Sequence, residues 1–123
     1  RGGVINNSSV ASFIAGGTYS AAKAWVRVFS ESLHAPMAAK GVTVMALCPG
    51  YTHTEFHDRA GINKSRVQDW LWLDSPTVVS ESIKDFTKGK AVSIPSNQYK
   101  VLSAAASYLP RPLVRRVGLA SQK

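Results

Sequence analysis

A strand-helix-strand pattern near the start of the chain constrains its fold more than any other feature. Residues 3–7 form a short apolar run that predicts a buried strand, and residues 42–48 form a nearly continuous apolar run of the kind that is covered on both faces in a parallel sheet. A helix is predicted between them, closed by Lys40 and Gly41. Two strands joined by a helix form a βαβ unit, so the sequence predicts an α/β fold.

The helix of this unit has an apolar face that we expect to pack on the sheet. Its residues recur at the i, i+3, i+4, i+7 and i+11 positions: Ala22, Trp25, Val26, Phe29 and Leu33. A second strip of small apolar residues lies on another face, where it would meet another subunit or another layer: Ala21, Ala24 and Val28. Pro36 predicts a kink or an early end of the helix, because proline inside a helix costs about 3 kcal/mol.

The second half of the chain predicts further helices and one more strand. Ser75 and Pro76 open a helix that runs to about Phe86, and residues 91–94 read as a third short strand. Residues 99–108 and 113–117 read as two short helices separated by prolines. In an open α/β sheet, ligands bind beyond the carboxyl ends of the strands, which is where Ser9 and the segment that begins at Pro49 are expected to lie.

Tyr19 and Lys23 stand four residues apart on the predicted helix, so both side chains project from the same face. A free tyrosine has a pKa of about 10 and is a poor acid or base at neutral pH. A cation within about 4–6 Å favours the phenolate and lowers that pKa. The pair therefore indicates a tyrosine that is able to transfer protons.

Three motifs in order resemble the short-chain dehydrogenases/reductases, most closely bacterial members of unassigned substrate. A strand ends in Asn7-Ser8-Ser9, Tyr19-x-x-x-Lys23 follows on a helix, and an apolar strand then closes in Pro49-Gly50-Tyr51-Thr52-His53-Thr54. The resemblance covers roughly residues 1–60 well, and the rest only in its order of elements. It implies a partial Rossmann-like, doubly wound parallel sheet of about three strands with flanking helices.

The resemblance also implies that residues 1–123 are a single partial domain, the C-terminal catalytic half of an NAD(P)-binding fold. The Gly-rich phosphate loop and the asparagine of the family's catalytic set do not precede Ser9 in this sequence. We therefore expect a fragment that lacks the N-terminal dinucleotide-binding half. The parent protein would be an oxidoreductase that interconverts a carbonyl and a secondary alcohol. The alternative is a truncated, non-catalytic binding module that lacks the cofactor cradle.

The resemblance assigns a role to each member of the motifs. Tyr19 would be the catalytic acid or base, Lys23 would lower its pKa and bind the nicotinamide ribose, and Ser9 would hold the substrate oxygen, with Ser8 and Ser12 as alternatives to Ser9.

The residues implied to bind the cofactor, NAD or NADP, are Tyr19, Lys23, Pro49, Gly50, Thr52 and Thr54. Phe13 and Tyr51 are predicted to line the substrate pocket, and Trp70 and Trp72 form either a lid or ordinary packing. In relatives, the helix that bears the tyrosine packs in a dimer, which implies a homo-oligomer.

Simpler interpretations stand beside these assignments. Ser9 is also suited to cap a helix, and Cys48 suits the core better than the role of a nucleophile. His53 and His57 have metal-ligand spacing, with His34 or Asp58 as a third ligand, but no second cluster supports them and we expect no metal.

Charge and composition limit the partners. The net charge is +8, from fifteen basic and seven acidic residues, but the basic residues are scattered and no nucleic-acid motif is present, so we expect no nucleic-acid partner. The densest basic cluster, Arg111, Arg115 and Arg116, is interpreted as a solvated tail rather than as a helix on an anionic membrane. A single cysteine and the lack of a signal-peptide pattern or a long apolar run favour the cytoplasm. A small molecule is the expected substrate.

Overall fold

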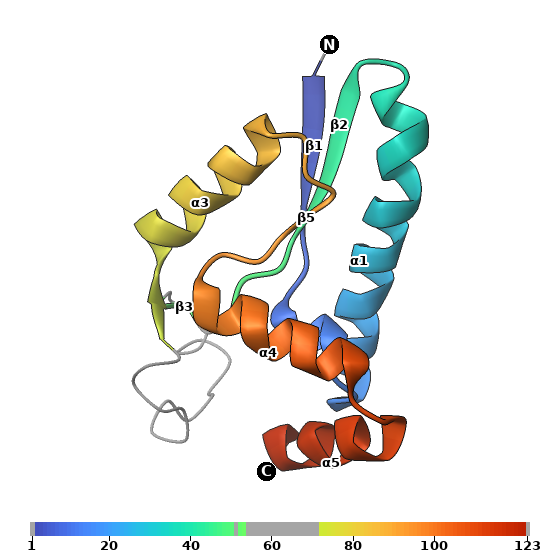
Figure 1. Cartoon of the computed structure of the whole chain (residues 1–123), viewed down its shortest axis with the longest axis vertical. Coiled ribbons are helices and arrows are strands. Elements are labelled where there is room, and N and C mark those ends of the chain that lie inside the picture. Colours follow the sequence, from blue (N-terminus) through green and yellow to red (C-terminus); the bar gives the residue numbers. More distant parts are fainter. Residues whose placement is uncertain (1, 51, 54–71, 123) are drawn as a thin grey trace.

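The structure, a computed structural model, describes residues 2–50, 52–53 and 72–122. Its main sheet is parallel, with the strand order β1-β2-β5, where β1 is Gly2–Asn7, β2 is Val42–Leu47 and β5 is Val92–Ser93. Helix α1 (Gly17–Ala38) lies on one side of this sheet and α3 (Ser75–Thr87) on the other (Figure 1). The α/β fold with a parallel three-stranded sheet between helices, predicted from the sequence, is confirmed.

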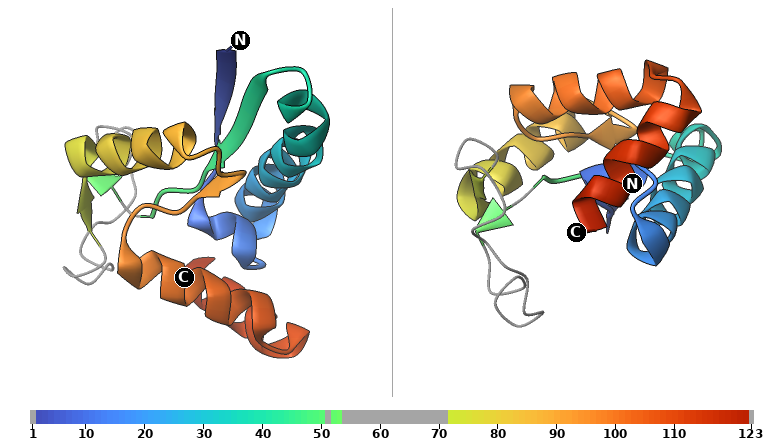
Figure 2. Two further views of the ribbon diagram at one scale, coloured as in Figure 1. Left: turned by 45° about the horizontal axis from the view of Figure 1, so that its top comes forward. Right: turned by 90° about the horizontal axis from the view of Figure 1, so that it is seen from below.

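The remaining elements lie toward the ends of the strands. A short 3-10 helix, η1 (Val10–Phe13), follows β1, and β3 (Thr52–His53) pairs with β4 (Leu73–Asp74) in a separate two-stranded sheet. Helices α4 (Asn97–Tyr108) and α5 (Arg111–Gln122) close the chain, and α4 crosses below the strand ends (Figures 1 and 2). Helices were predicted from Ser75 to about Phe86, at 99–108 and at 113–117; all three are present, but the last two begin two residues earlier and the last continues to Gln122. The sequence did not predict η1 or the β3–β4 pair.

Strand β2 forms the centre of the core. Met45 and Ala46 are fully buried, and Cys48 is buried directly after the strand, as its apolar run predicts. The prediction that β1 is also buried is wrong, because Val4 and Ile5 are exposed. Within the described residues, β1 is at the edge of the sheet and pairs only with β2, so one side of it has no neighbouring strand.

The predicted packing face of α1 is also wrong. Trp25 is 65% exposed and Phe29 is 45% exposed, and their rings stack on each other with centroids 4.9 Å apart. Polar residues instead hold α1 to the sheet: Asn6 Nδ2 of β1 donates to Ser30 Oγ at 3.0 Å, and His34 Nδ1 donates to the carbonyl of Val44 at 2.8 Å. These hydrogen bonds fix which side of α1 faces the sheet, and Trp25 and Phe29 are turned away from it, while Val26 and Leu33 of the predicted face are half-buried.

Helix α1 does not end at Pro36 but continues to Ala38. Pro36 lacks the N–H that would bond the carbonyl four residues earlier, at Ser32. Both residues are exposed, so water can take the place of that bond. The chain then turns at Gly41, whose φ of 78° favours glycine.

Asp85 joins α3 to the start of β5. Its carboxylate accepts a hydrogen bond from Ser93 Oγ at 2.7 Å and forms an ion pair with Lys90 Nζ at 3.0 Å. Burial of Asp85, which is only 7% exposed, acts to raise the pKa of its carboxyl, but the hydrogen bonds from Ser93 and Lys90 and the charge of Lys90 outweigh it. The pKa of Asp85 is therefore below its usual value.

We expect Asp85→Asn to lower the free energy of unfolding by about 1–3 kcal/mol at neutral pH, because Lys90 loses its partner and Ser93 keeps a weaker acceptor. A depressed pKa in the folded state means that this stabilisation is complete above the unfolded pKa of about 3.9 and is lost as the pH falls through the folded value. Urea unfolding of both proteins between pH 2 and 7 should therefore converge at the acidic end. Glu31→Gln, at an exposed ion pair, is the matched control. A difference that did not depend on pH would contradict the assignment.

Candidate active site

The candidate site lies where β1 and β2 end side by side. Asn7 pairs with Leu47 at the last position of the register, and the backbone N–H of Ser8 donates to the carbonyl of Leu47 at 2.7 Å. Just beyond, the N–H of Val10 donates to the carbonyl of Pro49 at 3.1 Å. The segments that follow the two strands are thereby held next to each other, as expected for the ligand-binding edge of an α/β sheet.

Lys23 fastens α1 to the end of β1. Its Nζ donates to the carbonyl of Asn7 at 3.3 Å, and Ser8 Oγ donates to the carbonyl of Lys23 at 2.7 Å. Tyr19 lies one turn earlier on α1, with Lys23 Nζ 5.7 Å from the centroid of its ring. The structure therefore brings Tyr19 and Lys23 together at the strand ends, and Tyr19 is 48% exposed, so a small molecule can reach it.

The three serines near β1 differ in what they bind. Ser8 and Ser12 are buried; Ser8 Oγ is committed to Lys23, and Ser12 Oγ accepts from Arg27 Nε at 3.0 Å. Ser9 is half-buried and its Oγ accepts from the N–H of Ala11 at 3.1 Å, so it does cap a helix, namely η1. An accepted hydrogen bond leaves the Ser9 O–H proton available for a further acceptor.

The residues predicted around the cofactor are only partly described. Gly50 lies against Tyr99 of α4, so closely that a Cβ at this position would overlap the Tyr99 ring. Thr52 is in β3, next to Leu73 of β4. Thr54 and Tyr51 lie outside the described residues, as do Phe56, His57, Asp58 and Trp70.

Phe13, predicted to line the substrate pocket, is the last residue of η1 and lies against α1. The Arg27 guanidinium lies over its ring at 4.3 Å. Trp72, the other half of the predicted lid pair, is half-buried just before β4.

Cys48 lies in the core beneath the site and is completely buried. Burial raises the pKa of its thiol, and the nearby Ser8 and Ser12 side chains only partly offset that effect. A buried thiol with a raised pKa is protonated at neutral pH and unreactive, which agrees with the prediction that Cys48 is a core residue.

The sequence did not reveal the clamp that Arg27 forms between η1 and α1. Besides Ser12 Oγ, Arg27 binds the carbonyl of Ser12 through Nη2 at 3.3 Å and pairs with Glu31 through Nη1 at 3.0 Å. The Arg27–Glu31 pair has the i, i+4 spacing that could have been noticed, whereas Ser12 is fifteen residues away and its contact depends on the tertiary fold.

Among residues 2–50, 52–53 and 72–122, no three histidine, cysteine, aspartate or glutamate side chains gather as a metal site would require. His34 donates through Nδ1 to the carbonyl of Val44. None of the described helices is long and apolar enough to cross a membrane.

Comparison with known proteins connects this geometry to one family. A family model described as short chain dehydrogenase matches residues 1–64. The diacetyl reductase [(S)-acetoin forming] of Staphylococcus epidermidis is 39% identical over 88 residues, which are 68% of this chain and 34% of that protein. The serine 3-dehydrogenase of Rhizobium radiobacter is 42% identical over 59 residues, 46% of this chain and 24% of that protein. The alignments span about a third or less of these relatives.

Solved structures show the same fold along nearly the whole chain. A short-chain dehydrogenase from Sphingobium yanoikuyae in complex with NADPH superposes with a TM-score of 0.67 and 26% identity, covering 98% of this chain and 45% of that one. A bulky-bulky ketone specific alcohol dehydrogenase from Comamonas testosteroni superposes with a TM-score of 0.60 and 23% identity, covering 98% and 43%. The second likeness is evidence of the fold alone.

Proposed function

Because the chain belongs to the short-chain dehydrogenase family, an oxidoreductase family that uses NAD or NADP, we propose that it carries the proton-transfer part of an active site that interconverts a carbonyl and a secondary alcohol. The observation that carries the proposal is the placement of Tyr19 and Lys23 on one face of α1, at the ends of β1 and β2. This edge of the sheet is where such folds bind their ligands. An exposed phenol beside an ammonium group suits proton transfer there.

In this proposal, Tyr19 exchanges a proton with the substrate oxygen, and Lys23 acts on Tyr19 and on the cofactor. The Lys23 ammonium has three N–H donors and gives one to the carbonyl of Asn7. Two donors remain, one for a ribose hydroxyl of the cofactor and one for the Tyr19 hydroxyl. The bond to Asn7 also limits the positions that the ammonium can take. The Lys23 charge lies 5.7 Å from the centre of the Tyr19 ring, where it would stabilise negative charge that develops on the phenol oxygen during proton transfer.

The described residues fit the nicotinamide end of NAD or NADP and not its phosphate end. Lys23 offers donors to a ribose, and Pro49, Gly50 and Thr52 follow β2 at the ligand-binding edge. The bound cofactor would supply or accept the hydride, while the protein holds the reactants and moves the proton. We propose that a dinucleotide-binding segment outside residues 1–123 supplies the phosphate contacts, and that these residues form the C-terminal half of one domain. The exposed edge of β1 supports this proposal.

Ser9 is the serine proposed to hold the substrate oxygen. Ser8 is buried and donates its proton to Lys23, and Ser12 is buried against Arg27, whereas Ser9 is half-buried and its proton is left to donate. We expect Ser9→Ala to lower kcat about 10²–10³-fold, the loss typical of one donor to a developing oxyanion. Steady-state kinetics and melting temperatures of Ser9→Ala and Ser9→Thr test this, because threonine keeps the hydroxyl. A lower melting temperature of Ser9→Ala with an unchanged kcat would assign Ser9 to helix capping alone.

The test of the whole proposal is a carbonyl reduction assay with NADH and with NADPH. Diacetyl is the first substrate to try, since the similar protein from Staphylococcus epidermidis is named for its reduction. The assay should be run on the 123-residue chain and on the longest polypeptide that contains it. Turnover by the longer polypeptide alone would support the division into two halves. Cofactor binding without turnover of any carbonyl by either would favour the second candidate, a non-catalytic binding module.

The Tyr19-bearing helix is also the proposed contact between subunits. Trp25 and Phe29 form an exposed aromatic pair on α1, and Val28 beside them is exposed as well. Large exposed apolar patches of this kind mark protein interfaces. Light scattering of the wild-type protein and of Trp25→Glu should show an oligomer that the charge dissociates. A wild-type protein that is monomeric in solution would contradict the proposed subunit contact.

A further inference from the structure

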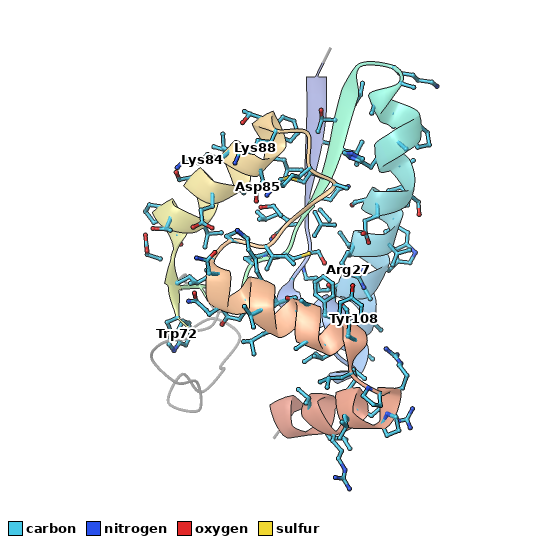
Figure 3. The ribbon with its side chains drawn as sticks, viewed as in Figure 1. Arg27, Trp72, Lys84, Asp85, Lys88 and Tyr108 are labelled. Atoms are coloured by element: carbon cyan, nitrogen blue, oxygen red, sulfur yellow. The ribbon has the colours of Figure 1, made fainter. Side chains whose placement is uncertain are left out.

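A groove of about 530 Å³ lies between η1, the first half of α1, the last turn of α4 and the start of α5, and Phe13 is among its lining residues. Neither Ser9, Tyr19 nor Lys23 lines it. Arg27, labelled on α1 in Figure 3, lines the groove together with Ala106 and Ser107 from the last turn of α4. The groove's polar and glycine lining comes from all four elements: Ser12, Gly17, Ser20, Arg27, Ser107 and Arg111.

Ser20 carries an unexplained hydroxyl at the wall of this groove. The residue is 3% exposed, and its Oγ has no hydrogen-bond partner among the residues that the structure describes. Buried hydroxyls are nearly always bonded, so an unpartnered one points to a group outside the described residues. Ser20 lies in the first turn of α1, whose N-cap, Gly16, provides no side chain to bond the free N–H groups of that turn. The N-terminus of this 22-residue helix adds a partial positive charge at the groove.

Two arginines line the same groove. Arg27 uses three of its five N–H donors, two on Ser12 and one on Glu31, so two remain. Arg111 is exposed at the start of α5. The charge of Arg27 is partly balanced by Glu31, which does not line the groove, whereas Arg111 forms no ion pair with the described residues.

We propose that this groove binds a small oxyanion, of the carboxylate or phosphate class. The anion would accept hydrogen bonds from Arg111, from the remaining donors of Arg27 and from the Ser20 hydroxyl, next to the N-terminus of α1. Arginine donors and a helix N-terminus are both suited to carboxylate and phosphate oxygens. The site would join η1 and α1, which carry Ser9 and Tyr19, to the two C-terminal helices.

Titration of the purified chain by ¹H–¹⁵N NMR tests the proposal, with inorganic phosphate and acetate in separate arms at constant ionic strength. Saturable shifts of the Gly17 and Ser20 amides and of the arginine Nε–H groups support it, and the arm that gives them identifies the class of anion. Arg111→Ala should weaken binding about tenfold, the effect of one charge-assisted hydrogen bond. Arg115→Ala is the matched control, because it removes the same charge from an exposed position of the same helix outside the groove.

Ser20→Ala separates binding from folding. Removing a buried hydroxyl that has no partner should not destabilise the chain, so a weaker affinity in this variant with an unchanged melting temperature reflects a lost ligand contact. Three results overturn the proposal: no saturable shift in either arm, equal losses in Arg111→Ala and Arg115→Ala, or an unchanged affinity in Ser20→Ala.

Discussion

Tyr19→Phe is expected to lower kcat about 10²–10⁴-fold in the active protein, the range that a positioned acid or base contributes. Phenylalanine keeps the ring beside Lys23 and removes only the hydroxyl. Since Tyr19 is 48% exposed and contributes little to the core, the variant should fold normally. NADH and NADPH titrations followed by fluorescence should give nearly unchanged dissociation constants. The change therefore appears in kcat with little change in cofactor affinity.

Tyr108→Phe is the control for this experiment. Tyr108 is a tyrosine on the surface at the end of α4, 90% exposed, so loss of its hydroxyl should leave kcat unchanged. Activity of Tyr19→Phe close to that of the wild type would exclude Tyr19 as the acid or base. A parallel loss of cofactor binding would instead indicate that Tyr19 positions the cofactor.

The order of elements could be predicted because it depends on local patterns. The buried strand at 42–47 shows itself as a continuous apolar run, and the helix that begins at Ser75 shows itself by Pro76 in its first turn. Asp74, immediately before this helix, caps it by accepting from the N–H of Thr77 at 3.1 Å. Such signals act over a few residues and do not depend on what the element packs against.

The orientation of α1 could not be predicted from the spacing of its apolar residues. Trp25 and Phe29 satisfy the helical periodicity as well as any buried pair, yet both are exposed. The sheet-facing side is chosen by partners distant in sequence: Asn6 for Ser30, and Val44 for His34. A periodicity argument assumes that the apolar face meets the core of the same chain, and it fails where the apolar face is left for another surface.

The sequence predicts which residues belong to the candidate site, but it does not predict the contacts that hold them in place. Spacing alone placed Tyr19 and Lys23 on one face of α1. The bonds that fix Lys23, to the carbonyl of Asn7 and from Ser8 Oγ, join residues fifteen or sixteen positions apart and involve backbone atoms that no side-chain pattern reveals. The choice among Ser8, Ser9 and Ser12 likewise needed their burial and partners.

Lys23→Ala should impair both turnover and cofactor binding, which distinguishes it from Tyr19→Phe. Loss of the ammonium removes the positive charge beside Tyr19 and the donors proposed for the ribose. We expect cofactor binding to weaken roughly 10- to 100-fold, as for a hydrogen bond to a charged group, and kcat to fall as well. Titration with NADH and steady-state kinetics at saturating cofactor measure the two effects separately.

The lysine also holds α1 to the end of β1, so a structural loss has to be separated from a chemical one. Lys23→Arg keeps a cation and a donor for the carbonyl of Asn7, and it should restore stability and part of the cofactor affinity. Lys88→Ala, at an exposed lysine just after α3, gives the effect of removing one positive charge elsewhere. If Lys23→Ala bound cofactor as tightly as the wild type, the ribose contact would be wrong. If kcat at saturating cofactor stayed at the wild-type value, Lys23 would serve only to anchor α1 and to bind the cofactor.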